Sequence, residues 1–359
     1  MVGLVSLLTL LSVQVASALD TASPASQGMS AELLRQGIVK LRQGQYGDID
    51  SLLVLRRGKL VLEEYLKPDY YGRDYRQPLR SVTKSFASAL IGIAIGQRRI
   101  RGVEARLPEF FPQYPTVNHP DSRKTEIMLH DLLSMSAGYQ WDELIRHYGD
   151  PQNDANRMLR SDDWVKFVLD LPMRDDPGVR LEYNSGVSLL LSAILQHATG
   201  QSAASYAQTY LFAPMGIVDW SWPVAMNDLT GTHWGLSMTR RDMARFGQLY
   251  LDRGQWQGRQ IVPGFWVDAS TAEQITGEPD TLYATYAYGY QWWRFRDFDA
   301  TVKLLDTNDV FFAYGDGGQL ILVAPHLELV VVSTANLPGA DFQLQFDLVR
   351  DHIFAAIRD

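Results

Sequence analysis

The chain has 359 residues, of which 46% are hydrophobic and 21% charged, enough to bury a large core as one large domain or two interleaved ones. The formal net charge is −8, and this acidic balance excludes a nucleic-acid partner, because such a partner requires a basic surface to neutralise its phosphates. No cysteine is present, which excludes disulfides, thiolate metal sites and a cysteine nucleophile.

The N-terminal segment has the features of a secretory signal. Residues 2–15 are uncharged and rich in leucine and valine, and Ala16-Ser17-Ala18 follows as a small-x-small pattern. The run is short for a membrane span and indicates a signal peptide at 1–18, cleaved after Ala18. No lysine or arginine precedes it, so an uncleaved or lipid-anchored form remains the alternative. We expect a periplasmic or secreted bacterial protein with a mature domain at 19–359 and no stable membrane insertion after signal removal.

Strand patterns lie at both ends of the chain and helical patterns lie between them. Helices are expected at 30–42, 127–136, 162–171, 188–199 and about 342–357. Strands are expected at 51–55, 60–65, 287–293, 309–314, 320–323 and 329–333. The pattern predicts an α+β fold in which an antiparallel sheet, built from about 45–80 and 280–359, is flanked by helices and encloses a helical region at about 85–220.

The stretch from Leu79 to Phe86 leads into an apolar segment that predicts a buried helix. Ser81 is expected in its first turn and Lys84 one turn later, so that the hydroxyl and the amine share a face. A serine nucleophile needs a neighbour that takes its proton, and a lysine can do so when burial and the helix dipole lower its pKa. The alternative, a serine cap and a solvated lysine, fits poorly with so apolar a helix.

A polar turn at 181–186 contains Tyr183-Asn184-Ser185 and precedes an apolar helix. Loops carry functional residues more often than core elements do. Tyr183 can relay a proton to a leaving group if nearby cations lower its pKa. The alternative is a packed tyrosine followed by ordinary helix-capping residues.

Three glycines lie close together in Tyr314-Gly315-Asp316-Gly317-Gly318-Gln319, between two expected strands. Glycines allow the backbone to approach a ligand closely and to direct an N–H group at an oxyanion. The alternative is a plain hairpin turn.

The seven histidines show no spacing typical of a metal site, so we expect no metal and no cofactor, and we interpret His130 as structural. Several aromatic residues are candidates either for lining a cleft or for ordinary core packing. They are Tyr139, Trp141, Tyr288, Trp292 and Trp293.

In this order, Ser-Val-Thr-Lys, Tyr-Asn-Ser-Gly and Gly-Asp-Gly-Gly-Gln resemble the three motifs of the penicillin-recognising serine hydrolases. The chain resembles their class C β-lactamase-related group, which includes D-alanyl-D-alanine carboxypeptidases, family VIII esterases and 6-aminohexanoate-dimer hydrolases. The connecting stretches 129–138, 235–247 and 288–293 are also similar, and the resemblance spans about 52–336. It implies a β-lactamase/transpeptidase-like fold with the site in a cleft between sheet and helical region.

The resemblance also implies roles for individual residues. Ser81 corresponds to the acylated serine, Lys84 to the base that deprotonates it, and Tyr183 to the proton shuttle. The backbone N–H groups of Ser81 and Gln319 correspond to the oxyanion hole. The expected substrate-binding residues are Ser185, Asp316, Gly317, Gly318 and Trp141.

Two positions depart from the pattern. Ser185 stands where asparagine is usual, and Asp316 stands where lysine or histidine is usual. A cation at the latter position receives the carboxylate of β-lactams, which an aspartate would repel. We therefore expect a serine hydrolase of small-molecule esters or amides that is not an efficient β-lactamase. The alternative is a non-catalytic or weakly catalytic penicillin-binding or cell-wall-binding protein of the same fold.

Overall fold

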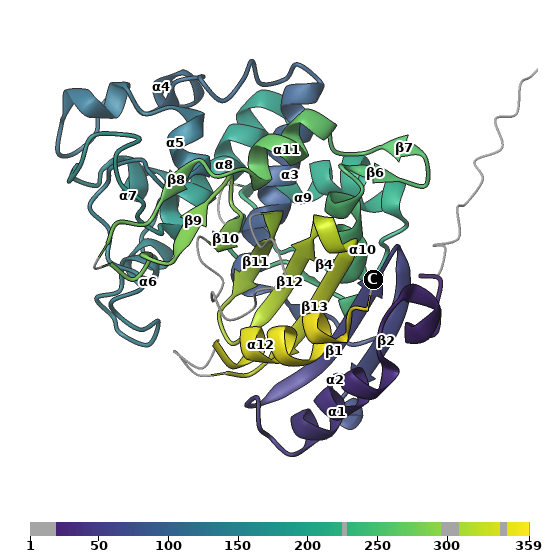
Figure 1. Cartoon of the computed structure of the whole chain (residues 1–359). Helices are drawn as coiled ribbons and strands as arrows, with labels where there is room; N and C mark the ends of the chain where they lie inside the picture. Colours follow the sequence, from purple (N-terminus) through teal and green to yellow (C-terminus); the bar gives the residue numbers. More distant parts are fainter. Residues whose placement is uncertain (1–18, 225–227, 280, 296–308, 338–342, 359) are drawn as a thin grey trace, which may run out of the picture.

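The computed structural model describes residues 19–224, 228–279, 281–295, 309–337 and 343–358 (Figure 1). The expected signal peptide at 1–18 lies outside these residues. No helix in the described part of the chain combines the length and the apolar character that crossing a membrane requires.

Among the described residues, eight strands form one antiparallel sheet that joins the two ends of the chain. In spatial order they are β2 Lys59–Tyr65, β1 Ile49–Arg56, β13 Leu329–Ala335, β12 Gln319–Ala324, β11 Phe311–Gly315, β10 Trp293–Phe295, β9 Tyr286–Tyr288 and β8 Ile275–Thr276. Because β1 pairs with β13, the N-terminal hairpin and the C-terminal strands share one sheet, as the sequence pattern predicted.

Helices cover both faces of this sheet, and the part of the chain that connects its N-terminal and C-terminal strands is mostly helical (Figure 1). The helices of the described residues are α1 Ala31–Arg42, α2 Pro68–Tyr71, α3 Thr83–Gly96, α4 Leu107–Phe110, α5 Leu129–Leu133, α6 Asp154–Leu159, α7 Trp164–Leu169, α8 Ser185–Thr199, α9 Ala203–Ala207, α10 Arg240–Leu251, α11 Gly264–Thr271 and α12 Gln343–Leu348. The short strands β3 Gln77–Pro78, β5 Ser237–Met238 and β4 Trp220–Ser221 form a small second sheet, and β6 Gln255–Trp256 pairs with β7 Arg259–Gln260.

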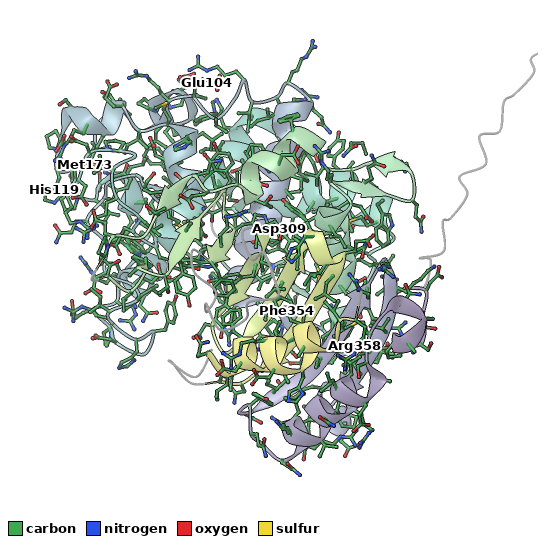
Figure 2. The ribbon with its side chains drawn as sticks, viewed as in Figure 1. Glu104, His119, Met173, Asp309, Phe354 and Arg358 are labelled. Carbon is green, nitrogen blue, oxygen red and sulfur yellow. The ribbon has the colours of Figure 1, made fainter. Side chains whose placement is uncertain are left out.

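Successive residues of the central strands enter two different cores. Ile321 and Val323 of β12 face the core that contains α3, α8 and α10, whereas Leu320 and Leu322 face the core beneath α1 and α12. Side chains alternate across a strand, so burial of both faces produces the continuous apolar runs seen in the sequence. Phe354, labelled in Figure 2, belongs to the second core near the end of the chain.

Two predicted elements differ in the structure. The strand expected at 287–293 is divided into β9 and β10 by a turn in which the Gly289 amide donates to the Trp292 carbonyl oxygen and Gln291 has a φ of 63°. The helix expected at 127–136 is limited to α5, because Met135 adopts a left-handed φ of 60°. Left-handed backbone at a non-glycine residue ends regular structure, and the hydrophobic pattern does not reveal it.

Candidate active site

The Ser81 hydroxyl lies in a short 3-10 turn, Arg80–Val82, directly before α3 rather than inside its first turn. Arg80 has a φ of 51°, a conformation that non-glycine residues rarely adopt. The turn is held by the Leu79 amide, which donates to the Leu236 carbonyl oxygen at 2.8 Å. Strained backbone of this kind concentrates at functional sites, where it fixes the direction of a side chain.

Lys84 lies in the first turn of α3 and its Nζ is 2.9 Å from Ser81 Oγ, as the three-residue spacing predicted. Its side chain is 1% exposed, whereas Ser81 is half-buried and so is the accessible member of the pair. Burial lowers the pKa of Lys84 to about 8, although the charge of Glu143 opposes this shift. Removing an ammonium group from water favours its neutral form, and a neutral amine can take a proton.

Two further oxygen atoms accept hydrogen bonds from Lys84. The Ser185 Oγ lies 3.1 Å and the His233 carbonyl oxygen 2.8 Å from Nζ. Ser185 is the first residue of α8, and Asn184 caps that helix by accepting from the Val187 amide at 3.1 Å. The second motif therefore reaches the amine through its serine as well as its tyrosine.

Tyr183 lies beside the same amine, with its ring centroid 4.8 Å from Lys84 Nζ. Trp293 stacks on the other face of this buried ring, with centroids 5.5 Å apart. The condition that nearby cations lower the pKa of Tyr183 is not met. Burial raises this pKa well above 10, Tyr288 and Glu143 add to the effect, and only a hydrogen bond with Ser81 opposes it. The group at this position is therefore a neutral phenol.

A single buried glutamine joins the helices that carry these groups. Gln291 accepts from Ser85 Oγ of α3 through its carbonyl oxygen and from Ser188 Oγ of α8 through its side chain, each at 2.7 Å. Its amide nitrogen donates to the carbonyl oxygens of Leu132 and Leu133 at 3.2 and 2.9 Å. The turn that divides the predicted strand at 287–293 thus fixes α3 against α8, and with them Lys84 against Ser185.

The sequence analysis did not identify Glu143, a buried residue in the loop between α5 and α6. Its Oε1 accepts from Ser185 Oγ at 2.6 Å and its Oε2 accepts from the Ser185 amide at 2.7 Å. The sequence contains little signal for Glu143, because this residue belongs to no motif and the segment around it has the composition of an exposed loop. Its contact with Ser185 and the effect of its charge on Lys84 connect it to the site.

The third motif forms the hairpin turn between β11 and β12. Gly315, the last residue of β11, lies against the Ser81 turn: a Cβ added there would lie 3.0 Å from the Ser81 nitrogen. Gln319 is paired with Gly315 across the hairpin, and its side chain donates to the Ala335 carbonyl oxygen at 2.9 Å. Only glycine, which has no Cβ, allows the backbone of β11 to approach the Ser81 amide this closely.

The other residues of this turn point in different directions. Asp316 is exposed, and its charge contributes to the raised pKa of Tyr148, a residue that donates to Glu143 at 2.8 Å. Gly317 is half-buried. Gly318 is buried, and a Cβ added there would meet Ala335 and Gln345. Of the substrate-binding candidates in the turn, Asp316 is the one exposed to solvent.

The candidate aromatic residues are mostly parts of the core. Tyr139, Tyr288 and Trp292 are each at most 2% exposed. Trp141 is also buried, and its Nε1 donates to Glu143 Oε2 at 2.8 Å, so it helps to hold this carboxylate in place. Trp293 differs, because it is half-buried and stacks on Tyr183.

No group of three histidine, aspartate or glutamate side chains in the described ranges has the arrangement of a metal site. His130 packs edge-on against the Tyr290 ring, and its Nδ1 lies 3.1 Å from Asp131 Oδ1. His233 is buried beside Lys84. Burial lowers the pKa of His233 well below 6.5, and the charge of Lys84 adds to this shift. The titratable groups nearest to Ser81 that remain as acid–base candidates are the Lys84 amine and the Tyr183 phenol.

Comparison with known families gives a match between residues 43–354 and the family model described as Beta-lactamase. The chain belongs to the beta-lactamase family. The matched range contains all three motif segments and the loop that carries Glu143. The α+β fold with its sheet built from both ends of the chain is therefore the β-lactamase/transpeptidase-like fold that the motifs predicted.

This beta-lactamase family member is 26% identical to the 6-aminohexanoate-dimer hydrolase of Paenarthrobacter ureafaciens over 342 residues, 90% of this chain and 81% of that protein. A solved structure provisionally described as a 6-aminohexanoate-dimer hydrolase from Bacillus anthracis has a TM-score of 0.74 at 20% identity, covering 95% of this chain and 89% of that one. The octameric penicillin-binding protein homologue from Pyrococcus abyssi has a TM-score of 0.68 at 17% identity, covering 89% of this chain and 77% of that one. The chain is thus a beta-lactamase-fold protein related to hydrolases.

Proposed function

We propose that the protein is a serine hydrolase that cleaves an ester or amide bond through a covalent acyl-enzyme. The observation that carries this proposal is the 2.9 Å contact between Lys84 Nζ and Ser81 Oγ, in surroundings that lower the pKa of the lysine to about 8. A nucleophile paired with a base that is partly neutral near physiological pH is the requirement for acyl transfer.

In the proposed reaction, Ser81 Oγ attacks the substrate carbonyl carbon while Lys84 takes the hydroxyl proton. The tetrahedral oxyanion accepts hydrogen bonds from the backbone N–H groups of Ser81 and Gln319. Tyr183 gives its phenol proton to the leaving alcohol or amine and recovers a proton from Lys84. Water then attacks the acyl-enzyme by the reverse route, so that the products are an acid and the released alcohol or amine.

We further propose that the substrate is a linear ester or amide that is neutral or carries an ammonium group. Asp316 occupies an exposed turn whose charge affects Tyr148 at the site, and a carboxylate there disfavours the anionic β-lactams. The similarity to a 6-aminohexanoate-dimer hydrolase favours linear amides within this class. Export to the periplasm or the medium, proposed from the N-terminal sequence, would give access to external substrates of this kind.

Labelling of the purified protein with a fluorophosphonate probe tests the proposal. We expect stoichiometric labelling that is lost in Ser81→Ala. A hydrolysis panel should then include nitrophenyl esters, D-amino-acid amides, an aminohexanoate dimer and a chromogenic cephalosporin. Turnover of esters or linear amides with little turnover of the cephalosporin is the expected result. Absence of labelling in the wild type would instead favour a binding protein of the same fold.

A further inference from the structure

We propose that Glu143 is a positioning residue: it holds the Ser185 hydroxyl as an acceptor, so that the lone pair of neutral Lys84 is left for the Ser81 proton during acylation. This inference rests on the proposed hydrolase function and concerns how the base is directed. Each step follows from the hydrogen-bond capacity of the groups involved.

The first step concerns the Glu143 carboxylate. Four donors reach it: Oε1 accepts from Ser185 Oγ at 2.6 Å and from the Tyr148 hydroxyl at 2.8 Å, and Oε2 accepts from the Ser185 amide at 2.7 Å and from Trp141 Nε1 at 2.8 Å. The indole and the backbone amide can only donate. A carboxylate surrounded in this way has all of its acceptor positions used and acts as a fixed negative group.

The second step concerns Ser185. Its hydroxyl has one hydrogen, and the 2.6 Å contact with Glu143 commits that hydrogen to the carboxylate. The lone pairs of the same oxygen therefore face Lys84 Nζ at 3.1 Å. A serine without this partner could rotate and donate to the amine instead, because a hydroxyl hydrogen turns to suit its surroundings.

The third step concerns Lys84. A neutral amine has two hydrogens and one lone pair. Ser185 Oγ and the His233 carbonyl oxygen both act as acceptors here, at 3.1 and 2.8 Å, and so they take the two hydrogens. The lone pair is left for Ser81 Oγ, 2.9 Å away, whose hydrogen is transferred in the acylation step.

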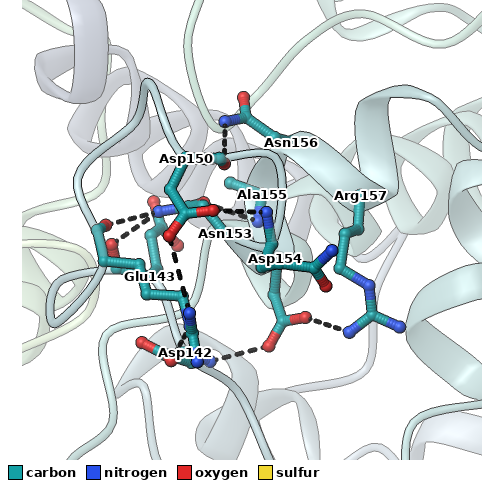
Figure 3. Close-up of polar contacts among 10 residues, drawn as sticks. Asp142, Glu143, Asp150, Asn153, Asp154, Ala155, Asn156 and Arg157 are labelled. Carbon is teal, nitrogen blue, oxygen red and sulfur yellow. Dashed lines mark hydrogen bonds and ion pairs between the residues drawn. The ribbon is translucent and has the colours of Figure 1, made fainter.

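The loop that carries Glu143 is built to hold it in place (Figure 3). Asn153 is fully buried, and its Nδ2 donates to the carbonyl oxygens of Glu143 and Arg146 at 2.8 and 2.7 Å. Asp154 Oδ2 accepts from the Asp142 amide at 2.8 Å, so the chain on both sides of Glu143 is tied to the start of α6. These bonds fix the backbone from which the carboxylate reaches Ser185.

The test compares Glu143→Gln with Asp142→Asn, a matched change at the adjacent acid, whose side chain pairs with Arg146 on the surface. We expect Glu143→Gln to lower kcat by about 10- to 100-fold with KM changed less than about threefold. The acid limb of kcat/KM should also move to lower pH, because the charge that raises the pKa of Lys84 is removed. Asp142→Asn should leave both the rate and the limb unchanged.

The acid limb of kcat/KM belongs to Lys84, because Tyr183 and His233, which also face the amine, titrate outside this pH range. The pKa of Tyr183 is well above 10 and that of His233 well below 6.5. If Glu143 only supported the fold, Glu143→Gln would reduce the fraction of active protein and leave the midpoint of the acid limb unchanged. A shifted limb therefore excludes loss of active protein as the sole effect, and the double variant with Ser185→Ala tests the positioning of the hydroxyl.

Ser185→Ala provides a second variant that removes little volume. We expect it to lower kcat about tenfold without moving the limb, and we expect Glu143→Gln to cost less rate in the Ser185→Ala background. Wild-type kinetics in both single variants, or full additivity of the two rate losses, would overturn the inference. Failure of the wild type to react with the fluorophosphonate would instead overturn the proposed function, so the two failures are distinguishable.

Discussion

The Lys84 amine lies 4.8 Å from the centroid of the Tyr183 ring, and burial shifts the pKa values of the two groups in opposite directions. It lowers the pKa of Lys84 to about 8 and raises the pKa of Tyr183 well above 10. Burial therefore shifts both groups toward their neutral forms, which for the lysine is a base and for the tyrosine is an acid. Environments that produce one neutral base and one neutral acid in contact give an acid–base assignment.

The first prediction concerns the pH dependence of the wild type. Because the active form of Lys84 is neutral, kcat/KM should rise with pH through a midpoint of about 8 and then reach a plateau. No decline should follow below pH 10, because Tyr183 keeps its proton throughout this range. Initial rates with an ester stable in alkali, measured in buffers of constant ionic strength from pH 6 to about 10, check this.

Tyr183→Phe is the control for this profile. It should retain the midpoint and lose rate, by about 10²- to 10⁴-fold, which is the usual contribution of one acid–base group. A midpoint near 6.5, typical of a histidine, would contradict the assignment of the base to Lys84.

The second prediction concerns stability. The pKa of Lys84 is about 8 in the folded protein and 10.5 as its ordinary value, so between these pH values the unfolded chain binds more protons than the folded one. The free energy of unfolding of the wild type should therefore increase with pH in this window relative to that of Lys84→Met, by about 3 kcal/mol in total. Urea unfolding of both proteins at a series of pH values measures the difference.

Ser81→Ala is the matched control, because it alters the same contact and keeps the buried amine. Its stability difference from the wild type should stay nearly flat across the window. A flat difference for Lys84→Met as well would mean that the amine keeps its ordinary pKa in the fold.

The fold was largely predictable because its strands and core helices carry strong periodic patterns. The run at 320–323 and the apolar segment after Lys84 both became the expected elements, β12 and α3. The division of 287–293 was not predictable, because it depends on the left-handed Gln291, whose side chain bonds α5 and α8 and whose main-chain carbonyl oxygen accepts from Ser85 of α3. Such tertiary bonds leave no local pattern in the sequence.

The site was predictable only where its residues are neighbours or belong to motifs. A spacing of three residues predicted the contact between Ser81 and Lys84. The direction of the Tyr183 pKa was not predictable, since it depends on the burial of the ring and on Tyr288 and Glu143. Glu143 itself is 42 residues from Ser185 in sequence, and long-range pairs of this kind become visible only in the folded chain.

The third prediction concerns the charge of the substrate. Asp316→Lys should raise kcat/KM for an ester that carries a carboxylate and lower it for one that carries an ammonium group, by about fivefold each. The effect is limited because Asp316 is exposed and solvent screens its charge. Two nitrophenyl esters of equal length, one anionic and one cationic, measure the ratio directly, and increasing salt should reduce it.

Glu104→Lys serves as the control for this prediction, because it changes the net charge by the same amount as Asp316→Lys. Glu104 is an exposed acid of the helical region, labelled in Figure 2, and its removal changes the net charge without changing the third motif. An equal change of the ratio in both variants would attribute the effect to net charge rather than to Asp316.

The fourth prediction concerns the contact between the third motif and the nucleophile. A Cβ at Gly315 would lie 3.0 Å from the Ser81 nitrogen and would collide with the Leu79 carbonyl oxygen, which is backbone and cannot rotate away. Gly315→Ala should therefore displace the Ser81 turn, lowering kcat by about 100-fold, because small displacements of reacting groups are costly. The overpacking should also reduce stability by about 1–3 kcal/mol.

The control is Gly264→Ala at the start of α11, where the nearest atom to the added Cβ lies 3.6 Å away and both activity and stability should be retained. Fluorophosphonate labelling rates and thermal unfolding check the two effects separately. A Gly315→Ala protein that unfolds earlier but labels at the wild-type rate would show that this contact supports the fold alone, and that the approach of β11 to the Ser81 amide has no part in the chemistry.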